Sequence, residues 1–400
     1  MRHLPDFPWD SLAPYKERAS AFSPTESRSD AEDTGGLVDL SVGTPVDPTP
    51  TAVRQALIDA ADAPGYPQTW GTPDLREAVA TWFAARRGVP DVDPAGVLPT
   101  IGSKELVAWL PTLLGLGPGD VVAFPRVAYP TYDVGARLAG ATPFAADATT
   151  AFGPVTPSSA PKLLWLNTPG NPTGKVLGIE HLAKVVAWAR ERGITVASDE
   201  CYAELDWRPE SERGRVPTTP SILDPRVTGG SHAGLLCVYS LSKQSNLAGY
   251  RAAFVAGDPA LVGQILEVRK HAGMIVPWPV QRALLAGLSD HTHVTEQKAR
   301  YAARRNVLKP AVESWGLRVD DSEAGLYLWA TAGEDSWRTV GRLAELGILA
   351  APGAFYGPAG AEHVRIALTA TDERIASAAR RLTYVSPADG ASSQTLPATG

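Results

Sequence analysis

An α/β fold with a mostly parallel central sheet, accompanied by a smaller α+β domain, is predicted by three observations. The chain has 400 residues, more than one compact core usually holds, so we expect two domains. From residue 98 onward short apolar runs alternate with helical patterns, which favours parallel strands covered by helices on both faces. From about residue 280 a long helical pattern and isolated strands replace this alternation, as is typical of an α+β domain.

The elements of the first domain follow from hydrophobic periodicity. Apolar runs predict strands at residues 120–124, 162–166, 194–198, 235–239 and 252–256. Helices are predicted at residues 132–138 and 179–192. In the second of these helices Leu182, Val185 and Val186 recur on one face, and Gly193 is typical of a helix C-terminus.

The second domain has longer helices and fewer strands. A helical pattern covers residues 280–309, strands are predicted at 326–329 and 364–368, and a further helix at 337–346. The predicted boundaries are an N-terminal arm at 1–36, part of the small domain at 37–64, a large ligand-binding domain at 65–279, the small C-terminal domain at 280–384 and a flexible tail at 385–400.

Composition excludes several classes of protein. Hydrophobic residues make up 44% and charged residues 20%, as in a soluble globular enzyme, and a net charge of −6 without a basic run gives no support for nucleic-acid binding. No apolar run reaches the roughly 20 residues of a membrane helix, and the N-terminus lacks a signal-peptide core. Cys201 and Cys237 lie in apolar stretches, which favours buried free thiols over a disulfide. We therefore expect a cytoplasmic protein with neither nucleic-acid nor membrane partners.

The tail ends in Leu-Pro-Ala-Thr-Gly at 396–400, which is similar to a sortase recognition pentapeptide. A wall-anchoring signal would continue into a hydrophobic segment and basic residues, and this sequence stops at the glycine. The tail is rich in Ala, Ser, Gly, Thr and Pro, which cannot bury a core. We interpret it as an accidental or engineered tail.

The most informative stretch surrounds Lys243, directly after an apolar strand. Ser240 and Ser242 precede this lysine by three residues and by one, and Arg251 follows it by eight. Open α/β sheets bind ligands where strands end. The stretch therefore supplies an amine for imine formation, together with a cation and hydroxyls for a phosphate dianion. The alternative is a surface lysine in a polar loop.

Two more polar stretches follow predicted strands. Asn-Pro-Thr-Gly at 171–174 alone indicates only a turn, and Asp199 at a strand end has several possible roles, including metal binding. Other chemistries lack their motifs, since there is no GxSxG elbow and no phosphate-binding GxxxxGK[ST] loop. His291 and His293 belong to no metal-binding pattern and favour a solvated helix start.

Taken in order, three motifs resemble the class I aminotransferases of fold type I, which depend on pyridoxal 5′-phosphate. They are Asn-Pro-Thr-Gly at 171–174, Asp-x-x-Tyr at 199–202, and Ser-x-Ser-Lys at 240–243 with an arginine eight residues later. The resemblance extends over residues 40–381 and implies the three-layer fold of the pyridoxal-phosphate-dependent transferases. It also implies that Lys243 forms the Schiff base with the cofactor and that the free amine shuttles the substrate Cα proton.

The resemblance implies roles for residues around the cofactor ring. Asp199 would pair with the pyridine nitrogen, while Tyr202 and Asn171 would bond the phenolic oxygen. Tyr129 would stack on the ring, with a core aromatic as the alternative. The phosphate would be held by the helix start at Ser103 and the Lys104 backbone. The residues around Lys243 would also bind it, namely Ser240, Ser242 and Arg251.

The resemblance also implies how substrate and a second subunit are engaged. Arg365 would hold the substrate α-carboxylate, with a structural salt bridge as the alternative, and Asn171 and Gly43 would line the substrate site. Tyr66 would reach the phosphate of a neighbouring subunit, which predicts a homodimer with shared active sites. The partners would be amino-acid and keto-acid substrates.

The closer resemblance is to actinobacterial-type N-succinyldiaminopimelate aminotransferases, through residues 40–48, 102–111, 268–274 and 367–374. The implied reaction transfers the amino group of glutamate to N-succinyl-2-amino-6-oxopimelate, in lysine and diaminopimelate biosynthesis. Arg269, Lys270 and the N-terminal arm are candidates for the distal carboxylate, and the sequence does not choose among them.

Alternatives are an aminotransferase for aspartate, alanine or aromatic substrates and a carbon–sulfur lyase. A non-catalytic, cofactor-sensing transcription regulator would need an N-terminal DNA-binding module, for which the arm before residue 37 is too short and too acidic.

Overall fold

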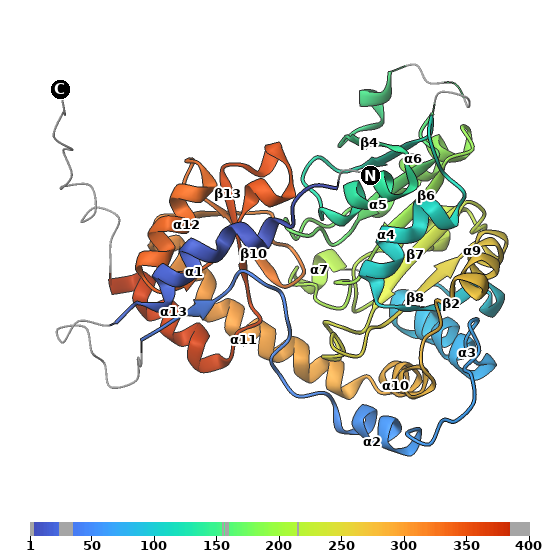
Figure 1. Ribbon diagram of the computed structural model, residues 1–400, viewed down its shortest axis with the longest axis horizontal. Coiled ribbons are helices and arrows are strands. Elements are labelled where there is room, and N and C mark those ends of the chain that lie inside the picture. The colour runs from blue at the N-terminus through green and yellow to red at the C-terminus, as the bar shows by residue number, and fades with distance from the viewer. Residues whose placement is uncertain (1–3, 24–34, 154–155, 157–159, 214–215, 385–400) are drawn as a thin grey trace.

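The computed structural model describes residues 4–23, 35–153, 156, 160–213 and 216–384. Figure 1 shows a large α/β unit beside a smaller unit. The smaller unit contains both the first α-helix, α1, and the last, α13. The predicted tail at 385–400 and its sortase-like pentapeptide lie outside the described residues.

The large unit is built on a seven-stranded sheet in the order β2-β8-β7-β6-β5-β3-β4. From β7 to β4 neighbouring strands are parallel, and only the pairs β2–β8 and β8–β7 are antiparallel, so the predicted mostly parallel sheet is confirmed. The strands are β2 (Val97–Ile101), β3 (Val121–Phe124), β4 (Thr142–Ala145), β5 (Leu163–Asn167), β6 (Thr195–Asp199), β7 (Leu235–Ser240) and β8 (Ala252–Gly257).

Helices cover both faces of this sheet because successive strand side chains point to opposite faces. Leu164 and Leu166 of β5 pack on one face with α3, α6 and α10, whereas Leu163 and Trp165 pack on the other with α4, α5 and α9. The fold therefore has the predicted three layers. The helices are α2 (Thr51–Asp59), α3 (Pro73–Trp82), α4 (Ser103–Leu113), α5 (Thr131–Ala139), α6 (Ile179–Arg190), α7 (Glu210–Arg213), α8 (Pro225–Thr228), α9 (Pro259–Ala272) and α10 (Trp278–Ser289).

The smaller unit is α+β, with a four-stranded antiparallel sheet in the order β12-β13-β10-β9. A short parallel pair joins β1 to β11. The strands are β1 (Val38–Asp39), β9 (Arg318–Asp320), β10 (Tyr327–Thr331), β11 (Ile348–Leu349), β12 (Ala351–Pro352) and β13 (His363–Ala367). The helices are α1 (Ala13–Ser20), α11 (Thr292–Ser314), α12 (Ser336–Glu345) and α13 (Asp372–Tyr384).

One expectation from periodicity is wrong. The continuous helical pattern at 280–309 is two helices, α10 and α11, because the chain is extended at Asp290 and its carboxylate accepts a hydrogen bond from the Thr292 amide. In the N-terminal arm, for which no element was predicted, a 3-10 turn (Pro8–Leu12) leads into α1. Tertiary packing stabilises that short helix, as the stacking of Tyr15 on Trp337 at 5.3 Å illustrates.

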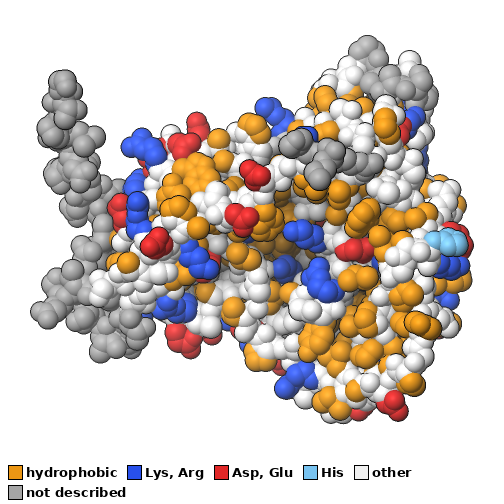
Figure 2. All heavy atoms as spheres, viewed as in Figure 1, with side chains coloured by type: hydrophobic (Ala, Val, Ile, Leu, Met, Phe, Trp, Pro, Cys, Tyr) orange, Lys and Arg blue, Asp and Glu red, His pale blue; other side chains and the backbone are white. Residues whose placement is uncertain are grey.

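Hydrophobic side chains gather on the visible face over α2, α3 and α10 (Figure 2). In the same region of the chain Ile58 is 66% exposed and Tyr66 is fully exposed. Large apolar patches of this kind mark interaction sites in many soluble proteins.

Candidate active site

Lys243 lies at the carboxyl edge of the large sheet. It follows β7, which is parallel to β6 and β5, so the residues that end these three strands meet at one edge. The Lys243 Nζ donates a hydrogen bond to the carbonyl oxygen of Gly43, which precedes the large unit in the chain. Burial lowers the pKa of the Lys243 amine, so the lysine is more readily a free base than an exposed lysine.

Asp199 ends β6 and is buried with both carboxylate oxygens in use. Its Oδ2 accepts from the Tyr132 hydroxyl over 3.1 Å, and its Oδ1 accepts from the Cys201 amide over 3.3 Å. Burial raises the pKa of Asp199, so a cationic partner would be needed to keep the carboxylate charged. Sequence reasoning did not assign Tyr132 to the site, although it lies three residues after the predicted stacking residue Tyr129.

The loop after β5 is held by Asn167. Its amide nitrogen donates to the Asp199 carbonyl over 2.9 Å, and its side-chain oxygen accepts from the Asn171 backbone amide over 2.7 Å. The loop also docks on the small unit, because the amides of Ser322 and Ala324 donate to its carbonyl oxygens. Asn171 is thereby fixed between the two sheets.

Arg365 of β13 reaches this loop from the small unit and is 3% exposed. Its Nη1 donates to Asn171 Oδ1 over 3.0 Å and its Nη2 to the Ser41 carbonyl over 2.6 Å. The Nε has no hydrogen-bond partner among the described residues. No described carboxylate pairs with Arg365, so the alternative of a structural salt bridge has no support in the described part of the chain. A buried guanidinium with an open donor fits an anionic ligand.

An anion also fits the start of α4. This helix begins at Ser103 without a side-chain cap, after Gly102, whose φ of +77° permits the turn. A Cβ on Gly102 would lie 2.0 Å from Arg251 Nη2, so the Arg251 guanidinium rests directly on this turn. Near it, the Ser240 hydroxyl lies 2.7 Å from the Ser242 hydroxyl and 3.2 Å from the Ala252 carbonyl, either of which can accept its one hydrogen, and it accepts from the Ser242 amide.

The groups at the start of α4 and at the end of β6 fit pyridoxal phosphate. The uncapped helix start and Arg251 suit the phosphate, while the buried Asp199 suits a protonated ring nitrogen. Tyr129 is half-buried and edge-on to Tyr132 at 6.0 Å, and burial raises the pKa of Tyr129 to about 12. When bound, the cofactor supplies an aldehyde for the amino group and a ring that withdraws electrons from Cα.

Three more of the predicted residues have distinct surroundings. Tyr66 is fully exposed and so contacts none of the site residues of its own chain. Lys104, whose backbone is predicted to hold the phosphate, has its Nζ 5.4 Å from the centre of the Phe7 ring. Gly43 is close to Tyr327, a residue that sequence reasoning placed only in a strand.

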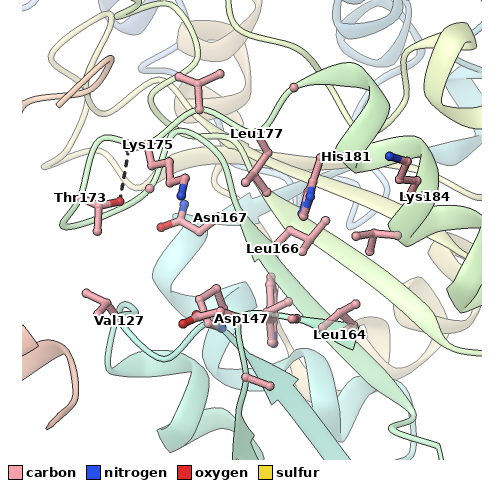
Figure 3. Close-up of a pocket in the computed structure, with 18 of the residues that line it drawn as sticks. Val127, Asp147, Leu164, Leu166, Asn167, Thr173, Lys175, Leu177, His181 and Lys184 are labelled. Atoms are coloured by element: carbon pink, nitrogen blue, oxygen red, sulfur yellow. Dashed lines mark hydrogen bonds between the residues drawn. The ribbon is translucent and has the colours of Figure 1, made fainter. Parts of the chain in front are cut away.

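A cavity of about 680 Å³ adjoins the site on the α6 side of the sheet. Asn167 lines it, but Lys243, Asp199 and Arg365 do not. Figure 3 shows Lys175 and His181 on the opposite wall from Val127 and Asp147. Gly170, Thr173 and Lys175 also line the cavity, so the loop that carries Asn171 forms part of its wall.

Other groups do not form a second centre. No cluster of His, Cys, Asp or Glu that could hold a metal occurs among the described residues, and Cys201 and Cys237 are buried free thiols. His293 lies at the start of α11 but is largely buried, so the predicted solvation is wrong, and its ring is bonded to Ser245 over 2.7 Å and to Asp290 over 3.2 Å. Ser245 is fully buried, so this array cannot meet a substrate. Within the described residues no helix has the length and apolarity needed to cross a membrane.

Comparison with known proteins gives concordant matches. The family model for aminotransferase class I and II matches residues 36–382. The chain is 57% identical to the 4-dedimethylamino-4-oxo-anhydrotetracycline transaminase OxyQ of Streptomyces rimosus, over 96% of this chain and 100% of the relative. It is 34% identical to the LL-diaminopimelate aminotransferase of Aquifex aeolicus, over 86% and 90%. A probable N-succinyldiaminopimelate aminotransferase from Thermus thermophilus superposes with a TM-score of 0.79 at 29% identity, over 94% and 100%.

Proposed function

This chain belongs to the class I and II aminotransferases, and we propose that it transfers the amino group of glutamate to N-succinyl-2-amino-6-oxopimelate. The observation that carries the proposal is Arg365, a buried guanidinium with an open Nε between two sheets. It suits the α-carboxylate that donor and acceptor share. The names of the Aquifex and Thermus relatives support a diaminopimelate-type acceptor.

The residues around Lys243 divide the chemistry. We assign to the Lys243 amine the removal of the substrate Cα proton, since its lowered pKa suits a base. Asp199 would hold the ring nitrogen of pyridoxal phosphate, and Tyr202 with Asn171 would bond its phenolic oxygen. Tyr129 would cover the ring. Ser103, the Lys104 backbone, Ser242 and Arg251 would hold the phosphate, with Ser240 supporting Ser242.

The acceptor carries a second, distant carboxylate that needs its own cation. Arg269 is fully buried and bonded to Glu105 over 2.7 Å, and Lys270 pairs with Glu267 on α9. Neither is therefore free to bind it. The Lys104 ammonium has no carboxylate partner among the described residues.

The N-terminal arm connects that ammonium to Arg365. Phe7, which Lys104 contacts, is 5.7 Å from Trp9, whose ring lies 5.8 Å from the Arg365 guanidinium. We assign the distal carboxylate to Lys104, with the arm as one wall of the acceptor site.

A homodimer is part of the proposal. The apolar face over α2, α3 and α10 (Figure 2) and the fully exposed Tyr66 support an interface at which Tyr66 reaches the phosphate of a second subunit.

A second acceptor class is favoured by the 57% identity to OxyQ, a transaminase named for a large oxo-anhydrotetracycline. A bulky cyclic ketone would contact the exposed ring of Phe7 and would not need the Lys104 cation.

One spectroscopic experiment tests both acceptors. Glutamate added to the purified holoenzyme should remove the cofactor's visible band, and the matching acceptor should restore it. Lys104→Ala should raise KM for the succinylated acceptor about tenfold and leave KM for pyruvate unchanged. Lys184→Ala, which removes a cation from the separate cavity, is the matched control. If a cyclic ketone restores the visible band and the succinylated acceptor does not, the succinylated acceptor is rejected and the bulky cyclic ketone is supported.

A further inference from the structure

Tyr327 lies where the small sheet meets the site. It is the first residue of β10 and is paired with Ala367 of β13, while Arg365 is paired with Trp329. Paired residues in an antiparallel sheet share a face, so Tyr327 and Arg365 are diagonal neighbours on one face. The Arg365 guanidinium carbon lies 4.0 Å from the centre of the Tyr327 ring, closer than to Tyr356 at 5.1 Å or Trp9 at 5.8 Å.

The other end of the same side chain reaches the large unit. The Tyr327 hydroxyl lies 3.1 Å from the hydroxyl of Tyr202, and the two rings meet edge to face at 5.7 Å. Both side chains are buried. Tyr327 therefore spans from the predicted carboxylate anchor to the residue predicted to bond the cofactor's phenolic oxygen.

Gly43 leaves the space for this hydroxyl. A Cβ on Gly43 would lie 2.1 Å from the Tyr327 Oη and 2.8 Å from its Cζ, which no side chain tolerates. The Gly43 carbonyl also accepts the bond from Lys243. The missing Cβ of Gly43, which is predicted to line the substrate site, thus gives room for the Tyr327 hydroxyl.

Charge settles which hydroxyl donates. Burial alone would raise the pKa of Tyr327, but the nearby cations Arg365 and Lys243 outweigh burial and lower it. Burial, reinforced by Tyr327, raises the pKa of Tyr202 well above its ordinary value. Tyr202 therefore keeps its one hydroxyl hydrogen, which the phenolic oxygen of the bound cofactor would accept, and the more acidic Tyr327 hydroxyl then donates to Tyr202.

We propose that Tyr327 is a positioning residue whose ring holds the Arg365 guanidinium and whose hydroxyl holds the hydroxyl of Tyr202. This inference rests on the proposed aminotransferase site at Lys243. One side chain then supports both the group proposed to bind the substrate carboxylate and the group proposed to bond the cofactor's phenolic oxygen. The two ends of Tyr327 have separable effects.

Tyr327→Phe removes the hydroxyl and keeps the ring. In the holoenzyme the pH midpoint of the cofactor's visible band should shift by about half a unit or more, because Tyr202 loses the hydroxyl that is hydrogen-bonded to its own. The Kd for glutarate, a dicarboxylate that cannot react, should stay within about twofold of wild type, since the ring still covers Arg365. An unchanged midpoint would overturn the role of the hydroxyl.

Tyr327→Leu removes the ring as well and should weaken glutarate binding about fivefold or more. Tyr356→Phe is the matched control, because it deletes a phenol hydroxyl beside Arg365 that has no hydrogen-bond partner among the described residues, and it should leave the midpoint in place. Wild-type glutarate affinity in Tyr327→Leu would overturn the role of the ring.

Gly43→Ala supplies a third measurement that does not depend on catalysis. The added Cβ should lower the thermal midpoint in wild type and lower it less in the Tyr327→Leu background, where the contacted atoms are gone. Equal losses in both backgrounds would contradict the contact. If the wild-type protein itself shows no visible cofactor band, the proposed function fails. The thermal midpoints of the Gly43→Ala variants would still test the contact between Gly43 and Tyr327.

Discussion

The Arg365 guanidinium donates to Asn171 Oδ1 across 3.0 Å and so ties the small antiparallel sheet to the loop after β5. A second donor bonds the Ser41 carbonyl, while Nε has no partner among the described residues and each Nη keeps a second hydrogen. The anchor is therefore oriented by the protein before any substrate binds, which lowers the ordering cost of binding.

Replacing Arg365 with lysine should not preserve function, because a single ammonium nitrogen cannot reproduce the planar fork that bonds Asn171 and Ser41 from two separate nitrogens and presents further donors to a carboxylate. We expect kcat/KM for glutamate to fall about 100-fold, mainly through KM. Steady-state kinetics of Arg365→Lys check this. A variant with wild-type KM would show that another group binds the α-carboxylate.

Lys243 should make the stability of the cofactor-free protein depend on pH. The unfolded chain holds the lysine proton up to the ordinary pKa of 10.5, whereas the folded chain loses it at lower pH. Between these two pKa values the unfolded state binds more protons, so the free energy of unfolding rises with pH; below them the cost of the buried ammonium is fully present.

Urea unfolding of cofactor-free wild type and Lys243→Met at several pH values isolates this group. The wild-type free energy of unfolding, minus that of the variant, should increase from about pH 7 to about pH 10. Lys243→Met should also lack the visible cofactor band and turnover. Parallel pH profiles of the two proteins would contradict a buried, neutral lysine.

Arg87 and Glu200 form a fully buried ion pair at 2.6 Å next to the Asp199 strand end. Arg87→Ala leaves the Glu200 carboxylate buried without its cation, so the free energy of unfolding should fall by about 3–5 kcal/mol. Arg282→Ala is the control, since its pair with Asp74 is solvent-exposed and worth about 1 kcal/mol at most. Similar losses in chemical denaturation would show that burial does not govern the Arg87 pair.

His293 should be structural despite its serine and aspartate neighbours. Its ring joins Ser245, two residues after Lys243, to the start of α11, so His293→Ala should lower the free energy of unfolding by about 1–2 kcal/mol. His291→Ala should cost less, because the buried His291 Nδ1 has no hydrogen-bond partner among the described residues. Ester hydrolysis that disappears in Ser245→Ala would instead reveal an accessible nucleophile.

The α/β class, the inner strands of the large sheet and the order of the motifs were predictable from sequence, because strand periodicity and short polar motifs are local. The edge strands β2 and β4 were not predicted. Lys243 and Asp199 follow neighbouring parallel strands, so the motif order alone predicted that they share one edge of the sheet. The break at Asp290 escaped prediction because apolar periodicity continues on both sides of a capping side chain.

The residues that support the motifs could not be predicted in this way, because they come from distant parts of the chain. Asn171 and Arg365 are 194 residues apart, and Tyr202 and Tyr327 are 125 apart. No periodicity links such positions, since their contact depends on how the small sheet docks on the loop after β5. The same docking brings Tyr327 to Gly43 and Arg365, a relationship that exists only once the chain has folded.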